Sequence, residues 1–230
     1  MAAPRRSAGF TLVELLVALF AMALLAVMSW RGLDGMARAQ EQTQARADEV
    51  LTLQVALAQW AADLDALIQL PGTAALDWNG RVLRVTRGSS AGPGAGMVVA
   101  AWSRREVEGR DTWLRWESAP ATTREQLERA WAQADIWSQN PGAEERSREV
   151  AVTPLAQWQI FYFRGGAWTN PLSSDATTGA PAPAAIPTGP AAAVLPDGVR
   201  LVLTLPPGPA ISGVLTRDWV RPTLSGGKAS

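Results

Sequence analysis

Glu14 is the residue of this sequence whose position most constrains its chemistry. It lies inside a run from Phe10 to Met28 in which Thr11 is the only other polar residue. A charged side chain in the centre of a bilayer costs about 3 kcal/mol, so an ionisable residue in such a run points to a function. Two arginines, Arg5 and Arg6, stand just before the run.

The run itself has the length of a membrane-spanning helix. At a rise of about 1.5 Å per residue, residues 10–30 cover about 30 Å, the thickness of the hydrocarbon layer. A cleavable secretory signal peptide would use Ala21-Met22-Ala23 as its small-residue site, but the apolar run continues beyond it. The other two interpretations are an ordinary signal anchor and an anchor that is cut on the cytoplasmic side, before the apolar run.

Catalytic residues are scarce in the rest of the chain. Gly88-Ser89-Ser90-Ala91-Gly92 matches the G-x-S-x-G pattern, which needs a strand before it and a helix after it, yet Pro93 follows. The chain has no histidine to act as a base and no cysteine, and its one lysine is Lys228 in the tail. We therefore expect no enzyme activity and no cofactor.

Metal and nucleic-acid binding are also disfavoured. The net charge is zero and no basic stripe is present, so we expect no nucleic-acid partner. Calcium needs six to eight oxygen ligands, and the oxygen-bearing side chains are scattered without a ligand pattern. These side chains are Asp77, Asn79, Asp135, Glu144, Glu145 and Asp197, and we expect no metal to bind to them.

A second helical stretch follows the apolar run. Residues 31–70 are rich in helix formers, and we expect an amphipathic continuation of the first helix that ends at Leu70-Pro71-Gly72. Gly32 and Gly35 weaken it and mark a bend or flexible point. Its apolar face is predicted from residues at three- and four-residue spacing: Val50, Leu53, Leu57, Trp60, Leu64 and Leu67.

Residues 71–224 are predicted to form an antiparallel β domain that packs on this helix, giving an α+β fold. A helical insertion near 122–137 begins at Thr122 and Thr123, which are suited to cap it. We predict a loop at residues 88–96, a flexible loop at residues 170–193 and a disordered tail at residues 225–230. Most of the eleven tryptophans are expected in the core. The predicted strands are 81–87, 97–106, 112–117, 149–152, 158–163, 199–205 and 211–220.

Gly9-Phe10-Thr11-Leu12-Val13-Glu14 closely resembles the processing motif of type IV pilins and type II secretion pseudopilins. The resemblance implies a basic leader, residues 1–9, that a prepilin peptidase removes between Gly9 and Phe10. It further implies that Phe10 becomes N-methylated. It also implies a pilin-like fold, a single helix in the inner membrane and a periplasmic carboxyl-terminal domain.

The same resemblance gives Glu14 a role in assembly. In the family, this carboxylate is thought to meet the terminal amine of a neighbouring subunit. Such a pair is strong in a low dielectric only when both members are well placed. The alternative is that Glu14 lies near the headgroups and is hydrated.

Later segments resemble the J family of type II secretion minor pseudopilins. The similar segments are 31–35, 158–163 with 165–168, 195–201 and 215–217. The resemblance implies a place at the tip of the pseudopilus, with minor pseudopilins I and K, and H, as partners in export of folded proteins. The alternatives are a minor pilin of a type IV pilus or DNA-uptake system, and a membrane-anchored binding module or enzyme.

Overall fold

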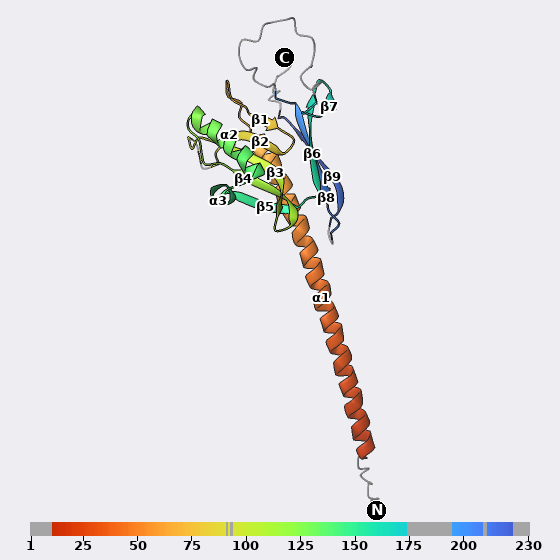
Figure 1. Ribbon diagram of the computed structural model, residues 1–230. Coiled ribbons are helices and arrows are strands. Elements are labelled where there is room, and N and C mark those ends of the chain that lie inside the picture. The colour runs from red at the N-terminus through yellow and green to blue at the C-terminus, as the bar shows by residue number, and fades with distance from the viewer. Residues whose placement is uncertain (1–10, 91, 93, 174–194, 209–210, 223–230) are drawn as a thin grey trace, which may run out of the picture. The chain divides into compact units, whose positions relative to one another are not determined.

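The computed structural model describes residues 11–90, 92, 94–173, 195–208 and 211–222. The chain divides into two compact units, Met1–Asp48 and Glu49–Ser230. One helix, α1 (Leu12–Asp65), belongs to both units and continues through Gly32 and Gly35 (Figure 1). The two glycines therefore do not interrupt the helix.

The helix ends earlier than the sequence predicts. The expectation of a helix as far as residue 70 is wrong, because the chain leaves α1 after Asp65 and pairs with a strand. Ile68 donates its backbone N–H to Thr86 O at 2.9 Å, and Leu67 forms an antiparallel bridge with Arg87. Backbone pairing with the sheet replaces the last turn of the predicted helix.

Five strands form sheet A, in the order β1-β2-β3-β4-β5, and every pair is antiparallel. Alternation along β2 and β3 sends large side chains to both faces of the sheet, which explains the dense burial of this region. The strands are β1 (Leu76–Trp78), β2 (Val82–Gly88), β3 (Met97–Val107), β4 (Arg110–Glu117) and β5 (Glu149–Pro154).

Four strands form sheet B, in the order β7-β6-β8-β9, again with antiparallel pairs. Residues of β8 alternate between buried and half-buried from Val199 to Leu205, so one face of this sheet looks into the core. The strands are β6 (Gln157–Arg164), β7 (Ala167–Thr169), β8 (Gly198–Leu205) and β9 (Gly213–Val220).

Two tight turns set the register of two hairpins. Glu108 and Gly109 join β3 to β4 with φ of 51° and 75°, and Gly165 and Gly166 join β6 to β7 with φ of 57° and 84°. Two-residue turns with positive φ at both positions match the twist of antiparallel strands.

The amphipathic end of α1 lies between the two sheets. Its apolar side chains join one cluster with residues from sheet A and sheet B, and Trp60 is fully buried there. This confirms the predicted apolar face and the α+β arrangement of a long helix packed on antiparallel sheets. The cluster includes Leu53, Ala56, Leu64, Leu83, Val85, Trp102, Trp113, Ile160, Val199, Leu201, Leu203 and Trp219.

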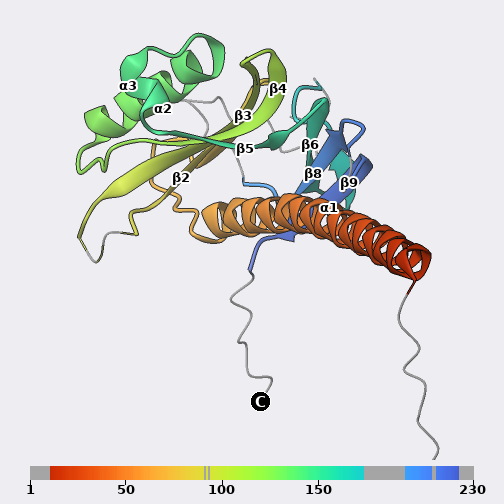
Figure 2. The ribbon, with the colours of Figure 1, turned by 90° about the horizontal axis from the view of Figure 1, so that it is seen from below.

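A second helix, α2 (Arg124–Gln139), covers the other face of sheet A (Figure 2). Thr123 is its N-cap. The hydroxyl oxygen of Thr123 accepts from Gln126 N at 3.2 Å, and Gln126 Oε1 accepts in return from Thr123 N at 3.2 Å. The predicted cap is confirmed. Four of its side chains pack against sheet A residues, among them Trp116 of β4, in a second core cluster: Leu127, Ala130, Ala134 and Trp137.

The sequence prediction omitted three short elements. These are β1, β7 and helix α3 (Ala143–Arg146). Segments this short show no periodicity of their own, and their neighbours in space hold them. Seven of the eleven tryptophans are buried, as expected. The leader 1–9, most of the loop 170–193 and the tail 225–230 lie outside the described residues.

Candidate functional site

The described structure begins where the processing motif meets the helix. Glu14 Oε2 accepts from both the backbone N–H and the hydroxyl of Thr11, each at 3.1 Å, and Thr11 Oγ1 accepts from Glu14 N at 3.3 Å. This reciprocal arrangement is a capping box at the start of α1. It satisfies two backbone donors that the first turn of a helix otherwise leaves open.

The capping box gives Glu14 a partner within its own chain. A carboxylate in the first turn also interacts favourably with the positive end of the helix dipole. Glu14 was predicted from the sequence as a functional residue, but the capping role of Thr11 was not, although the T-x-x-E spacing of residues 11–14 is the usual sequence signal of a capping box. Gly9 and Phe10 lie outside the described residues, so their cleavage and methylation stay predictions.

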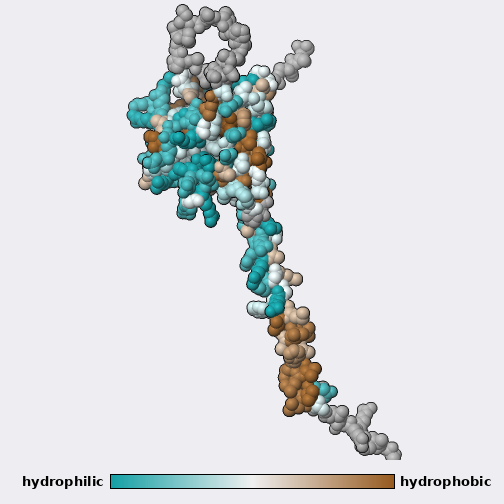
Figure 3. Space-filling view, turned by 45° about the vertical axis from the view of Figure 1, so that its right-hand side comes forward, coloured by the Kyte–Doolittle hydropathy of each residue, from teal (hydrophilic) through white to brown (hydrophobic). Residues whose placement is uncertain are grey.

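Apolar side chains surround the first part of α1 on every side. Leu12, Phe20 and Trp30 are 75%, 71% and 74% exposed, and no residue of this part is buried. Figure 3 shows this part of α1 in brown, followed by hydrophilic residues further along the helix. In length and composition, α1 is the one helix of the described chain able to span a membrane. These features indicate a membrane-anchored protein.

A buried carboxylate fixes the other end of α1 to sheet A. Asp63 is 1% exposed and accepts from Arg115 Nε and Nη2 at 2.8 Å, and from Trp102 Nε1 at 2.9 Å. Arg87 Nε lies 3.1 Å from Asp63 Oδ1. A buried charge needs partners of this kind, because solvation by water has been lost.

Glu117 completes this cluster on β4. Its Oε2 accepts from Arg115 Nη2 at 2.7 Å and pairs with Arg87 Nη2 at 2.5 Å. Burial acts to raise the pKa of Glu117, but the bonds from the two guanidinium groups outweigh it and lower that pKa. For Arg115, burial acts to lower the pKa, and the bonds to Asp63 and Glu117 raise it instead.

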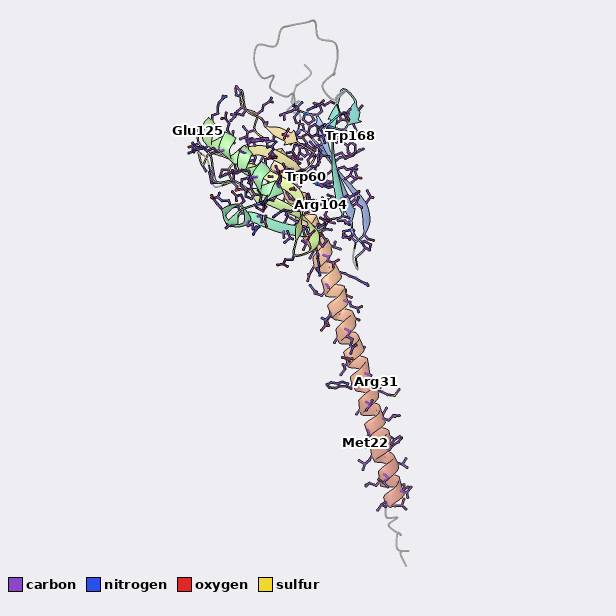
Figure 4. All side chains as sticks on the ribbon, in the orientation of Figure 1. Met22, Arg31, Trp60, Arg104, Glu125 and Trp168 are labelled. Carbon is purple, nitrogen blue, oxygen red and sulfur yellow. The ribbon has the colours of Figure 1, made fainter. Side chains whose placement is uncertain are left out.

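Sheet B has its own polar contact with the helix. Trp219 Nε1 of β9 donates to Asp65 Oδ1 at 2.7 Å. Asp63 and Asp65 therefore hold α1 to sheet A and to sheet B. Figure 4 labels Trp60, which lies one turn before them on the same helix.

The G-x-S-x-G residues and the scattered acidic residues do not form a catalytic or metal site among the described residues. After Gly88-Ser89-Ser90, the next regular element is β3 and not a helix, so the G-x-S-x-G residues do not form a nucleophile elbow. Asp77 pairs with Arg84, Asp197 pairs with Arg221, and Asp135 accepts from Asn79. Within the described residues, no three His, Cys, Asp or Glu side chains come together as a metal site.

The comparisons with known proteins bear on the first of these sites. Residues 4–30 match the model of the prokaryotic N-terminal methylation motif. The match contains Gly9, Phe10 and Glu14, so the motif predicted from the sequence is confirmed. No curated protein matches the chain.

Among solved structures, the chain is similar to one in the GspK-GspI-GspJ complex from the type 2 secretion system of enterotoxigenic Escherichia coli. The similarity covers 76% of this chain and 99% of that chain, at 15% identity and a TM-score of 0.44.

Proposed function

We propose that this protein is a minor pseudopilin of a type II secretion system, part of the complex that starts and caps the pseudopilus. The observation that carries the proposal is the methylation motif, which leads directly into one uninterrupted apolar helix. A β domain packed on the far end of that helix supports it, because such a domain would remain in water while the helix is held in the membrane. The resemblance of later segments to the J family supports the particular subunit.

We infer that the partners are minor pseudopilins I and K, and H, and that a prepilin peptidase processes the chain in the inner membrane. A line of exposed apolar side chains on α1, here called the outer stripe, supports the inference that a partner packs against α1 with a helix of its own. Leu51 and Val55 are 56% and 68% exposed, and Ala58 and Ala62 continue the line with spacings of three and four residues. This spacing is that of a helix-packing seam, and its small residues permit close approach.

The stripe lies on the side of α1 opposite the residues that enter the core. Leu53, Ala56, Trp60 and Leu64 face the two sheets, so the helical period of 3.6 leaves the stripe on the outer side. Exposed leucine and valine in a line favour burial against another protein. The side chains of this stripe are therefore available for packing against the helix of a neighbouring subunit.

The first test is mass spectrometry of the mature amino terminus. The proposal predicts a chain that begins at Phe10 and carries one methyl group on its amine. A chain that begins after Ala23 would make the protein an ordinary secreted one, and an uncut chain would make it an ordinary anchor.

The second test separates the secretion system from a pilus. Deletion of the gene should stop export of folded proteins across the outer membrane and leave twitching and DNA uptake unchanged. Co-expression of the full chain with the I and K subunits of the same secretion system should give a complex that purifies together. Loss of pili or of DNA uptake, with normal export, would instead support the minor pilin.

A further inference from the structure

A polar groove lies where sheet A, the end of α2 and the start of β6 come together. Its volume is about 640 Å³, which is in the range of sites that bind small organic ligands. Figure 4 labels Arg104, which reaches the groove from β3. The other lining residues that the argument uses are Arg81, Gln139, Gln157, Trp158 and Gln159.

The charges at the groove balance one another. Arg104 Nη1 lies 2.7 Å from Asp111 Oδ2, so the charge of this arginine is paired. Asp135 Oδ2 accepts from Gln139 Nε2 at 2.9 Å, which places a second carboxylate beside the groove that Arg81 lines. Two arginines are thus matched by two carboxylates. A groove without excess charge favours a neutral ligand over a phosphate or an acidic segment.

A β-strand of another protein has no room to pair along β6 at the groove. Ile160 is 2% exposed and does not line the groove, so the accessible part of β6 is limited to residues 157–159. Leu172 packs against Gly80 at the rim. The side chains of the groove, and not a free strand edge, are therefore what a ligand can bind.

Three glutamines give the groove hydrogen-bonding groups without charge. Gln157 and Gln159 are exposed, and no described residue forms a hydrogen bond with either side-chain amide. Gln139 donates from Nε2 to Asp135, and no described residue donates to its Oε1. An amide group both donates and accepts hydrogen bonds, as a hydroxyl group does. The three amides are therefore suited to a ligand that carries several hydroxyl groups.

Trp158 adds a flat apolar surface between the two glutamines of β6. Its ring is partly exposed and packs edge to face with Trp78, with ring centroids 4.6 Å apart. Gln157, Trp158 and Gln159 all line the groove although alternate residues of a strand point to opposite faces, so the groove lies at the edge of β6. An aromatic ring fixed by its neighbour is a preorganised surface for the C–H face of a sugar ring.

We propose that this groove binds a neutral saccharide chain. One sugar ring stacks on Trp158, and its hydroxyl groups exchange hydrogen bonds with the amides of Gln157, Gln159 and Gln139. The proposal goes beyond the role in secretion and does not depend on it, because no residue of α1 lines the groove.

The test is isothermal titration calorimetry of the full chain in a polyoxyethylene detergent, which carries no sugar. The probes are chitohexaose, cellohexaose and maltohexaose, which distinguish N-acetylated chains from unacetylated chains with β or α linkages. A neutral hexapeptide of Ser, Thr and Val represents the competing class of ligand. The variants are Gln159→Ala and Trp158→Leu, with Gln54→Ala on an exposed side of α1 as the matched control.

At least one of the three sugars should bind with a Kd of about 1 mM or tighter. Gln159→Ala and Trp158→Leu should each weaken that binding by about fivefold or more, and Gln54→Ala should stay within about twofold. Circular dichroism checks the fold, and Gln159→Ala alone decides if Trp158→Leu disturbs it, since Gln159 is exposed. The proposal is overturned if no sugar binds at about 10 mM, if the peptide binds as tightly as the sugars, or if the Gln159 and Gln54 changes have equal effects.

Discussion

The guanidinium of Arg115 meets the carboxylate of Asp63 edge to edge, with Nε donating to Oδ2 and Nη2 donating to Oδ1 at 2.8 Å each. The two residues are 52 positions apart, one on α1 and one on β4. Asp63 is 1% exposed and the Arg115 side chain is 14% exposed, so the pair is screened from water. It is the central polar contact between the long helix and sheet A.

Removal of the Asp63 charge should destabilise the domain strongly. Asp63→Ala removes the carboxylate that Arg87 and Arg115 share and leaves Glu117 as their remaining acidic partner. Loss of one member of a buried pair costs about 3–5 kcal/mol. The measurement is urea unfolding followed by tryptophan fluorescence. Asp34→Ala is the control, because its pair with Arg38 is exposed and is worth about 0.5 kcal/mol. Equal losses in the two variants would refute the central role of Asp63.

Glu117 should make the stability depend on pH at the acid end. Its pKa in the folded protein lies below its ordinary value of 4.5, so the unfolded chain takes up the proton first as the pH falls. The stability that Glu117 contributes is fully present when the pH is above the ordinary pKa. It is lost as the pH falls through the lower pKa of the folded protein. Glu117→Gln should therefore be less stable than the wild type near neutral pH, and the difference should shrink as the pH falls below the ordinary value of 4.5.

Unfolding curves at several pH values test this prediction. A constant difference between the wild type and Glu117→Gln over the whole range would show that the carboxylate charge is not the source of the effect. Glu108→Gln is the matched control, since Glu108 lies at an exposed turn and its change should leave the pH profile unaltered.

Glu14 has two separable roles, as a cap and as a charge. Glutamine serves in a capping box as glutamate does, so Glu14→Gln keeps the cap of α1 and removes the charge. If a neighbour's terminal amine needs the charge, this variant should fail to co-purify with its partner subunits. Thr11→Val removes the capping hydroxyl at a cost of about 1 kcal/mol to the helix end and should still assemble. Normal assembly and export of Glu14→Ala would refute the electrostatic account.

The outer stripe of α1 should be needed for association and not for folding. Val55→Glu places a charge at a position that is 68% exposed, so the domain itself should lose less than about 0.5 kcal/mol. Burial of that charge against a partner helix would be costly, and the complex should not form in co-purification. Gln42→Glu on another side of the helix is the control and should leave the complex intact. Association that survives Val55→Glu would exclude the stripe as the contact.

The sequence predicted most of this fold because its longer elements carry clear patterns. The apolar face of α1, the alternation in β8 and the threonine cap of α2 are local signals, and local signals are readable from one sequence. Asp63 is different, because its partners Arg87, Trp102 and Arg115 come from distant strands. Its own position was the available signal: it stands beside Leu64 on the apolar side of the helix, where a carboxylate needs a partner.

The capping box at Thr11 and Glu14 was also readable, since it needs only a three-residue spacing. The early end of β7 at Thr169 was not, because no pattern within β6 reveals where its neighbouring strand stops. Topology, and not composition, determines that feature.

The position of α1 between two sheets has a mechanical consequence. Its last turns are fixed on one side through Asp63 and on the other through Asp65, with Trp60 enclosed between. A force along the axis of this segment therefore loads both polar contacts and the surrounding core in shear, at the same time. Such a joint resists extraction far better than a helix that peels from a single surface, one turn after another.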